Sequence, residues 1–246
     1  MKLWPLLGAL VLVEIAYPLV HGGTRAALTV ATVVAGYLLS VGHAWWSRGP
    51  RAAALLVAVT TGGGFVVEAI GRETGYPFGD YDYTGALGPR LLGVPLVIPL
   101  AWTWMAWPAW VAAARLTERR WLRVGVAGVG LAAWDLFLDP QMVGEGYWHW
   151  DAPGATLPGV PDIPLTNYLG WLLVASVLAA ALTFTVTARP VRGDDGVMYA
   201  LYLWTYASSV LAHAVFLGLP ASAAWGALGM GLVAVPLAVT LWRSRS

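Results

Sequence analysis

The sequence predicts an all-α fold, a polytopic membrane helix bundle with about eight transmembrane helices. Of the 246 residues, 59% are hydrophobic and only 11% are charged, whereas charged residues make up about 25% of an average soluble domain. The apolar residues gather in runs close to the roughly 20 residues that a helix needs to cross a bilayer. We therefore expect residues 1–246 to form a single integral-membrane domain of a multi-pass protein of the cell membrane.

Glycine and proline separate the apolar runs, as at Gly22-Gly23 and Gly49-Pro50. The fifth run is expected to stop at Pro140, because proline disfavours the helical conformation of the residue before it. Two long connections, residues 71–93 and 140–164, remain between the runs. The expected helices span residues 3–20, 26–46, 52–70, 94–114, 121–139, 165–188, 196–217 and 221–242.

Lysine and arginine predict the orientation, because the cytoplasmic loops of membrane proteins carry an excess of both. With the N-terminus in the cytoplasm, only Arg25, Arg72 and Arg90 of the 14 lysines and arginines fall outside. Both termini are then cytoplasmic, and the two long connections are outer loops. The inner set is Lys2, Arg48, Arg51, Arg115, Arg119, Arg120, Arg123, Arg189, Arg192, Arg243 and Arg245.

Charge and composition exclude several classes of function. A net charge of +1 is not the basic footprint of a nucleic-acid-binding protein. The chain has no cysteine, which excludes disulfides, thiolate metal ligands and thiol nucleophiles. The four histidines are isolated from one another, without the paired spacings of helical metal ligands. We therefore expect no metal site.

Ionisable residues of four expected helices fall at a similar depth in the outer half of the bundle. They are Glu14, Glu68, His213 and the pair Asp135 and Asp139. Such residues are costly in a membrane and almost always face the interior of a bundle. Their common depth predicts one polar chamber, roofed by the two long outer loops.

Asp135 and Asp139 lie four residues apart and therefore share one helix face. Two neighbouring carboxyl groups away from water favour a state in which one keeps its proton and the other is ionised. These two residues and Glu68 are the candidate catalytic groups. The alternative is structural: a carboxylate pair that faces water or bonds a loop amide, and for Glu68 a polar contact between helices.

Aromatic residues of the two long loops are candidates for the walls of a substrate-binding pocket. Residues 75–83 combine aromatic residues with turn formers, which is typical of an ordered lid. The candidates are Tyr81, Tyr83, Trp148 and Trp150. The alternative is an aromatic belt at the membrane interface.

Polar residues of the helices complete the candidate substrate-binding set. Tyr206 and His213 lie on one face of the helix expected over residues 196–217. Glu14 is the candidate from the first helix, with a bond to His21 as one alternative. Asn167 begins the sixth helix, where it either lines the chamber or caps the helix.

Three stretches resemble the integral-membrane carotenoid 1,2-hydratase family, which includes γ-carotene 1'-hydratases and bisanhydrobacterioruberin hydratases. The resemblance covers residues 60–175, and its most specific block is DLFLDP with the aromatic residues that follow. The stretches are GYPFGDYDYTGALGPRLLGVPLVIPLAW, AAWDLFLDPQMVGEGYWHW and GVPDIPLTNYLGW.

The resemblance implies that water is added across the terminal double bond of an acyclic carotenoid, giving a tertiary alcohol without any cofactor. Asp139 or Asp135 would donate the proton, and Glu68 would act as the base for water. Tryptophan and tyrosine faces would stabilise the tertiary carbocation through cation–π attraction. The implied partners are an acyclic carotenoid or other isoprenoid lipid, water and membrane lipid, and no nucleic acid.

Two other classes of function remain open. A protonation-initiated isoprenoid cyclase or isomerase needs the same acid and aromatic walls but excludes water. A non-catalytic carotenoid- or lipid-binding membrane protein needs a pocket but no acid. A transporter would show repeated halves and helices broken at mid-membrane, and the sequence shows no internal repeat.

Overall fold

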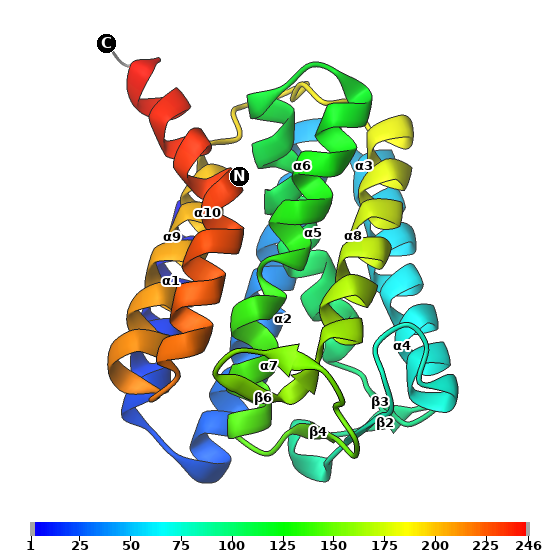
Figure 1. Cartoon of the computed structure of the whole chain (residues 1–246). Coiled ribbons are helices and arrows are strands. Elements are labelled where there is room, and N and C mark those ends of the chain that lie inside the picture. The colour runs from blue at the N-terminus through cyan, green and yellow to red at the C-terminus, as the bar shows by residue number, and fades with distance from the viewer. Residues whose placement is uncertain (1–2, 245–246) are drawn as a thin grey trace.

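The computed structural model describes residues 3–244 and confirms the expected helix bundle (Figure 1). Each of the eight expected helices has one counterpart, although several are broken into shorter elements. The segments are α1 (Trp4–Ala16) with η1 (Tyr17–Leu19); α2 (Gly22–Arg48); α3 (Pro50–Leu56), η2 (Val57–Gly62) and α4 (Gly63–Thr74); α5 (Ile98–Leu116); α6 (Arg120–Ala132) and α7 (Asp135–Gly144); α8 (Leu165–Thr185); α9 (Gly196–Leu211) with η4 (Ala212–Phe216); and α10 (Pro220–Arg243).

Length and hydropathy mark the chain as a multi-pass membrane protein. Within the described residues, five helices are long and apolar enough to cross a membrane. They are Gly22–Arg48, Pro50–Thr74, Arg120–Gly144, Leu165–Thr185 and Pro220–Arg243.

Helix α5 packs in the centre of the bundle against α2, α4, α6, α8, α9 and α10, so it needs no lipid-facing surface. Close packing there depends on glycine: a Cβ atom on Gly64 would lie 2.8 Å from Cγ of Trp102. Pro108 lies inside α5 and leaves the carbonyl of Trp104 without its helical donor. Ser40 of α2 donates to that carbonyl instead, at 3.0 Å.

The helix expected to stop at Pro140 does not stop there, so that expectation is wrong. The break comes earlier, between α6 and α7, and α7 continues through Pro140. Proline cannot donate to the carbonyl of Leu136, one turn before it. The hydroxyl of Ser222 on α10 donates to this carbonyl at 2.7 Å and replaces the missing bond.

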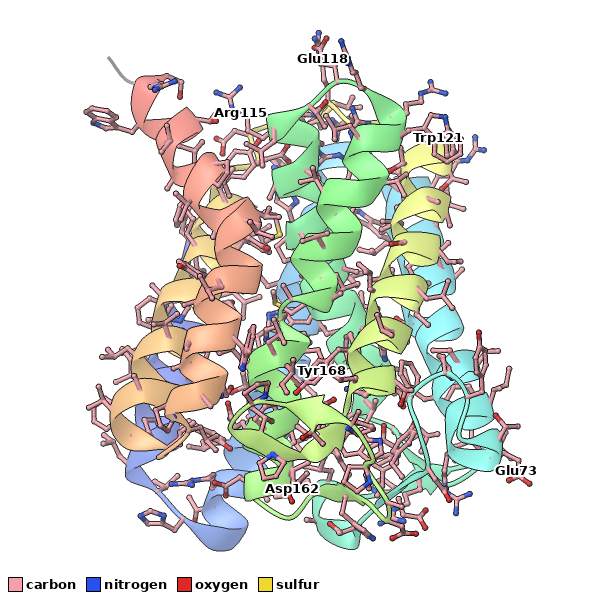
Figure 2. The ribbon with its side chains drawn as sticks, viewed as in Figure 1. Glu73, Arg115, Glu118, Trp121, Asp162 and Tyr168 are labelled. Atoms are coloured by element: carbon pink, nitrogen blue, oxygen red, sulfur yellow. The ribbon has the colours of Figure 1, made fainter. Side chains whose placement is uncertain are left out.

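The two long loops lie together at one end of the bundle, and the terminal ends of α1 and α10 lie at the other (Figure 1). Figure 2 shows the same division: Glu73 and Asp162 mark the loop end, and Arg115 and Glu118 mark the opposite end. This arrangement agrees with both termini on one side of the membrane. Lys2 and Arg245, which belong to the predicted inner charges, lie outside the described residues.

Short strands that the sequence had not indicated join the two loops. β1 (Tyr81–Tyr83) from the first loop pairs with β4 (Trp148–Trp150) from the second in an antiparallel sheet. The remaining short elements are η3 (Gly85–Leu87), β2 (Arg90–Leu91), β3 (Val94–Pro95), β5 (Thr156–Leu157) and β6 (Val160–Pro164).

The role of Ser222 can be measured by a double-mutant cycle with Pro140. We expect Ser222→Ala to lower the free energy of unfolding by about 1–3 kcal/mol, because it leaves the buried carbonyl of Leu136 without a donor. In the Pro140→Ala background the backbone N–H is restored, so the same change should cost less. Equilibrium unfolding in detergent micelles checks this. Equal losses in both backgrounds would contradict the assignment, and Ser244→Ala is the control, because Ser244 is exposed and its hydroxyl bonds only to a carbonyl of its own helix.

Candidate active site

The β1–β4 sheet turns four aromatic side chains inward. In its register Tyr81 pairs with Trp150 and Tyr83 with Trp148. Successive side chains of a strand point to opposite faces, and these four are buried while the residues between them are exposed. The two loops therefore form one aromatic roof over the bundle.

Beneath this roof lies a pocket of about 160 Å³, bounded by side chains of α1, α2, α4, α5, α7, α8, α9 and both loops. Its volume is similar to the roughly 150 Å³ of an engineered apolar cavity that binds benzene. The predicted residues on its wall are Glu14, Glu68, Tyr81, Tyr83, Asp139, Trp148, Trp150 and Asn167. Three other predicted residues, Asp135, Tyr206 and His213, lie outside the lining. The loops thus roof one pocket as predicted, but only Glu14, Glu68 and Asp139 of the five ionisable residues line it, and most of its wall is apolar.

One amide group connects the two aspartates of α7. The Nδ2 atom of Asn167 donates to Asp135 Oδ2 at 2.9 Å and to Asp139 Oδ2 at 2.5 Å. Asp135 is 0% exposed and Asp139 is 3% exposed. Among residues 3–244, no lysine or arginine pairs with either aspartate. Two buried carboxylates without a cation are strongly disfavoured, so the arrangement favours a pair that retains a proton.

The members of this pair have different surroundings. Asp139 lines the pocket, and Trp148 Nε1 donates to its Oδ1 at 3.2 Å. Asp135 lies behind it, and its Oδ1 is buried without a hydrogen-bond partner. Asn167 is not the cap of α8, because Pro164 occupies the N-cap position.

Glu68 of α4 accepts three hydrogen bonds. Tyr81 and Tyr83 donate to Oε2 at 2.6 and 2.7 Å, and Trp102 donates to Oε1 at 2.9 Å. Burial, and then the charge of Glu68, raises the pKa of both tyrosines far above the usual value, so the phenols keep their protons. All three partners can donate, which favours the ionised form of the carboxyl group, whereas its burial opposes this form.

Aromatic side chains that the sequence did not single out form much of the pocket wall. Trp102 and Trp171 stack with ring centroids 3.9 Å apart, and Trp134 contacts Trp171 edge-on at 6.3 Å. A sequence signal for two of them existed. Trp171 is four residues after Asn167, on the same helix face, and Trp134 directly precedes the aspartate pair.

Tyr206 and His213 support the helices around the pocket. The Nε2 atom of His213 lies 3.0 Å from the carbonyl oxygen of Phe137. Phe137 lies between the two aspartates in the sequence of α7. The hydroxyl of Tyr206 donates to the carbonyl of Ala227 on α10 at 3.2 Å. Both contacts position backbone, and neither side chain reaches the pocket.

Glu14 reaches the pocket from α1. It accepts a hydrogen bond from Trp204 Nε1 of α9, whereas His21 bonds to Arg25 at 3.0 Å instead. In the part of the chain that the structure describes, no group of three or more histidine, aspartate or glutamate side chains is arranged to hold a metal ion.

The three bonds to Glu68 predict a measurable coupling. We expect Tyr83→Phe to lower the free energy of unfolding by about 1.5–3 kcal/mol, the range for hydrogen bonds to charged groups. The loss should be smaller in the Glu68→Gln background, where the acceptor is neutral. Denaturant unfolding in micelles gives both values, with the exposed Tyr76→Phe as control. A loss that is independent of the charge at residue 68 would contradict the arrangement.

Comparison with known proteins places the chain in a family. Residues 22–236 match the family described as carotenoid biosynthesis protein. The bisanhydrobacterioruberin hydratase of Haloarcula japonica is 33% identical over 139 residues, which are 54% of this chain and 45% of that protein. The match thus spans less than half of that relative's length, and no solved structure matches the chain. Because the family match covers most of the sequence, and as the three motifs predicted, the chain belongs to the carotenoid biosynthesis protein family.

Proposed function

We propose that the chain is a carotenoid hydratase of the cell membrane, a hydro-lyase that adds water to the terminal double bond of an acyclic end group. The observation that carries this proposal is the buried Asp135–Asn167–Asp139 array at the wall of an aromatic pocket. The family and the hydratase from Haloarcula japonica support it. The product is a tertiary alcohol.

Asp139 is the proton donor in this proposal, because it is the member of the pair that lines the pocket. Its O–H bond breaks as the π electrons of the terminal double bond form a new C–H bond. Asp135 shares the proton of the pair with Asp139, and Asn167 holds the two carboxyl groups at a fixed separation, so both act as positioning residues. General acids placed in this way accelerate reactions by about 10²–10⁴-fold.

The tertiary cation left by protonation needs a stabilising environment without a nucleophilic side chain in contact. The indole faces of Trp102, Trp134 and Trp171 supply cation–π attraction, worth about 2 kcal/mol when desolvated. In its ionised form, Glu68 adds a negative charge to the same pocket. Three donors already occupy three of its roughly four lone-pair sites, so we assign it to charge stabilisation in place of the base role expected from the sequence.

The size and position of the pocket match this substrate class. A volume of about 160 Å³ accommodates a branched end group of about benzene size, but not a whole polyene. The remainder of the carotenoid would therefore extend out of the pocket, toward the lipid from which it comes. A site inside a membrane bundle suits a substrate that is insoluble in water.

Product analysis tests the proposal. We expect cells that accumulate lycopene or another acyclic carotenoid to form, with the wild-type chain, a pigment heavier by one water molecule. Asp139→Asn should abolish this product, because the general acid is lost. Asp135→Asn should lower its rate by about 100-fold, the lower end of the contribution of a general acid, because Asp139 then lacks the carboxyl group that shares its proton. Chromatography with mass spectrometry measures both.

The exposed Asp162→Asn variant is the control for expression and folding (Figure 2). Full hydration by a folded Asp139→Asn protein would remove Asp139 from the chemistry. A new product of unchanged mass would instead identify a cyclase or isomerase.

A further inference from the structure

The pocket has a second polar wall, formed by α1, α2 and α9. In Figure 1, α1 and α9 lie on the left of the bundle, α4 with Glu68 lies on the right, and α7 with the aspartates lies between them. Glu14 is the carboxyl group of this second wall. The hydroxyl-bearing residues Tyr17 of η1, Thr32 of α2, and Ser208 and Ser209 of α9 also line the pocket.

Hydrogen-bonding capacity is left unused on this wall. Trp204 donates to Oε2 of Glu14, and among the described residues none donates to Oε1 of this half-buried side chain. Tyr17 and Thr32 are 8% and 9% exposed, and within residues 3–244 neither hydroxyl group has a hydrogen-bond partner in good geometry, although Gln141 and Thr29 lie close to that of Tyr17. A buried polar group without a partner costs about 1–3 kcal/mol, and such groups are usually satisfied in native proteins. Their presence on a pocket wall points to a small hydroxylic ligand.

A purely structural role for Glu14 explains fewer of these observations. A tie between α1 and α9 accounts for the bond from Trp204 to Glu14, but it needs only one carboxylate oxygen. It leaves the open oxygen of Glu14 and the two unpaired hydroxyls without a reason. Glu68 shows the contrast, because both of its oxygens are already occupied.

We infer that Glu14 is the base that binds and deprotonates the water molecule added to the substrate, with the hydroxyls of Tyr17 and Thr32 holding that water. This inference deepens the proposed hydratase function and rests on it. The proton donor Asp139 and the base Glu14 come from different helices of the same pocket. The end group would lie between them, so that the proton and the water reach it from different walls.

The steps balance. Asp139 gives its proton to carbon and becomes a carboxylate, and the substrate becomes a cation. The water oxygen then forms the C–O bond, and one of its O–H bonds breaks as the proton passes to Glu14. Glu14 afterwards releases this proton to water and Asp139 takes one up from water. The sum is alkene plus water giving the alcohol.

Purified protein in deuterated water separates the two steps. The Glu14→Gln variant keeps an acceptor for Trp204 but lacks the base. We expect alcohol formation to fall by about 100-fold, within the range for loss of a general base, with little change in KM for the carotenoid. Protonation by Asp139 continues, and the cation returns to alkene by losing a proton. The recovered carotenoid should therefore gain deuterium at its end group.

Matched variants decide the outcome. Asp139→Asn should show neither alcohol nor deuterium, Glu14→Asp should recover part of the hydration, and the exposed Glu73→Gln should behave as wild type (Figure 2). Wild-type hydration by Glu14→Gln would overturn the inference. A parallel loss of alcohol and deuterium in folded Glu14→Gln would also overturn it, because Glu14 would then be structural. If the wild-type protein forms neither the alcohol nor the deuterated carotenoid, the hydratase proposal itself is rejected.

Discussion

The site depends first on two hydrogen bonds, which the Asn167 amide donates to the two aspartates of α7. Carboxyl groups inside a membrane bundle are costly, and this amide from α8 holds two of them at a fixed separation. The backbone of α7 is held in turn from outside, by Ser222 at the carbonyl of Leu136 and by His213 at that of Phe137. The position of the acid is thus set by three neighbouring helices.

The aromatic roof closes the same site from the loop end. Pairing of β1 with β4 places two tyrosines and two tryptophans over the pocket and brings both tyrosine hydroxyls onto Glu68. One small sheet therefore shapes the pocket and fixes its charge. Glycines allow the walls to approach: a Cβ atom on Gly71 would lie 2.9 Å from Phe78 and 3.2 Å from the hydroxyl of Tyr81.

The helices could be predicted because apolar length is a strong local signal, and the shared depth of the ionisable residues indicated the polar chamber. The course of α7 through Pro140 could not be predicted, because it depends on the hydroxyl of Ser222, which lies on a helix far away in the sequence. The β1–β4 pairing joins two loops whose sequences give no separate sign of strands. The roles proposed here for Glu68 and Glu14 depend on how many hydrogen bonds each accepts, which no sequence pattern shows.

Isotope labelling of the wild-type reaction tests the acid-catalysed mechanism most directly. In deuterated water enriched in ¹⁸O, the alcohol should carry one solvent deuterium on the carbon next to the carbinol carbon and ¹⁸O in its hydroxyl group. This result follows if the carboxyl pair delivers a solvent-derived proton to carbon and water captures the cation. An alcohol without carbon-bound deuterium, or with oxygen from O₂, would contradict the mechanism.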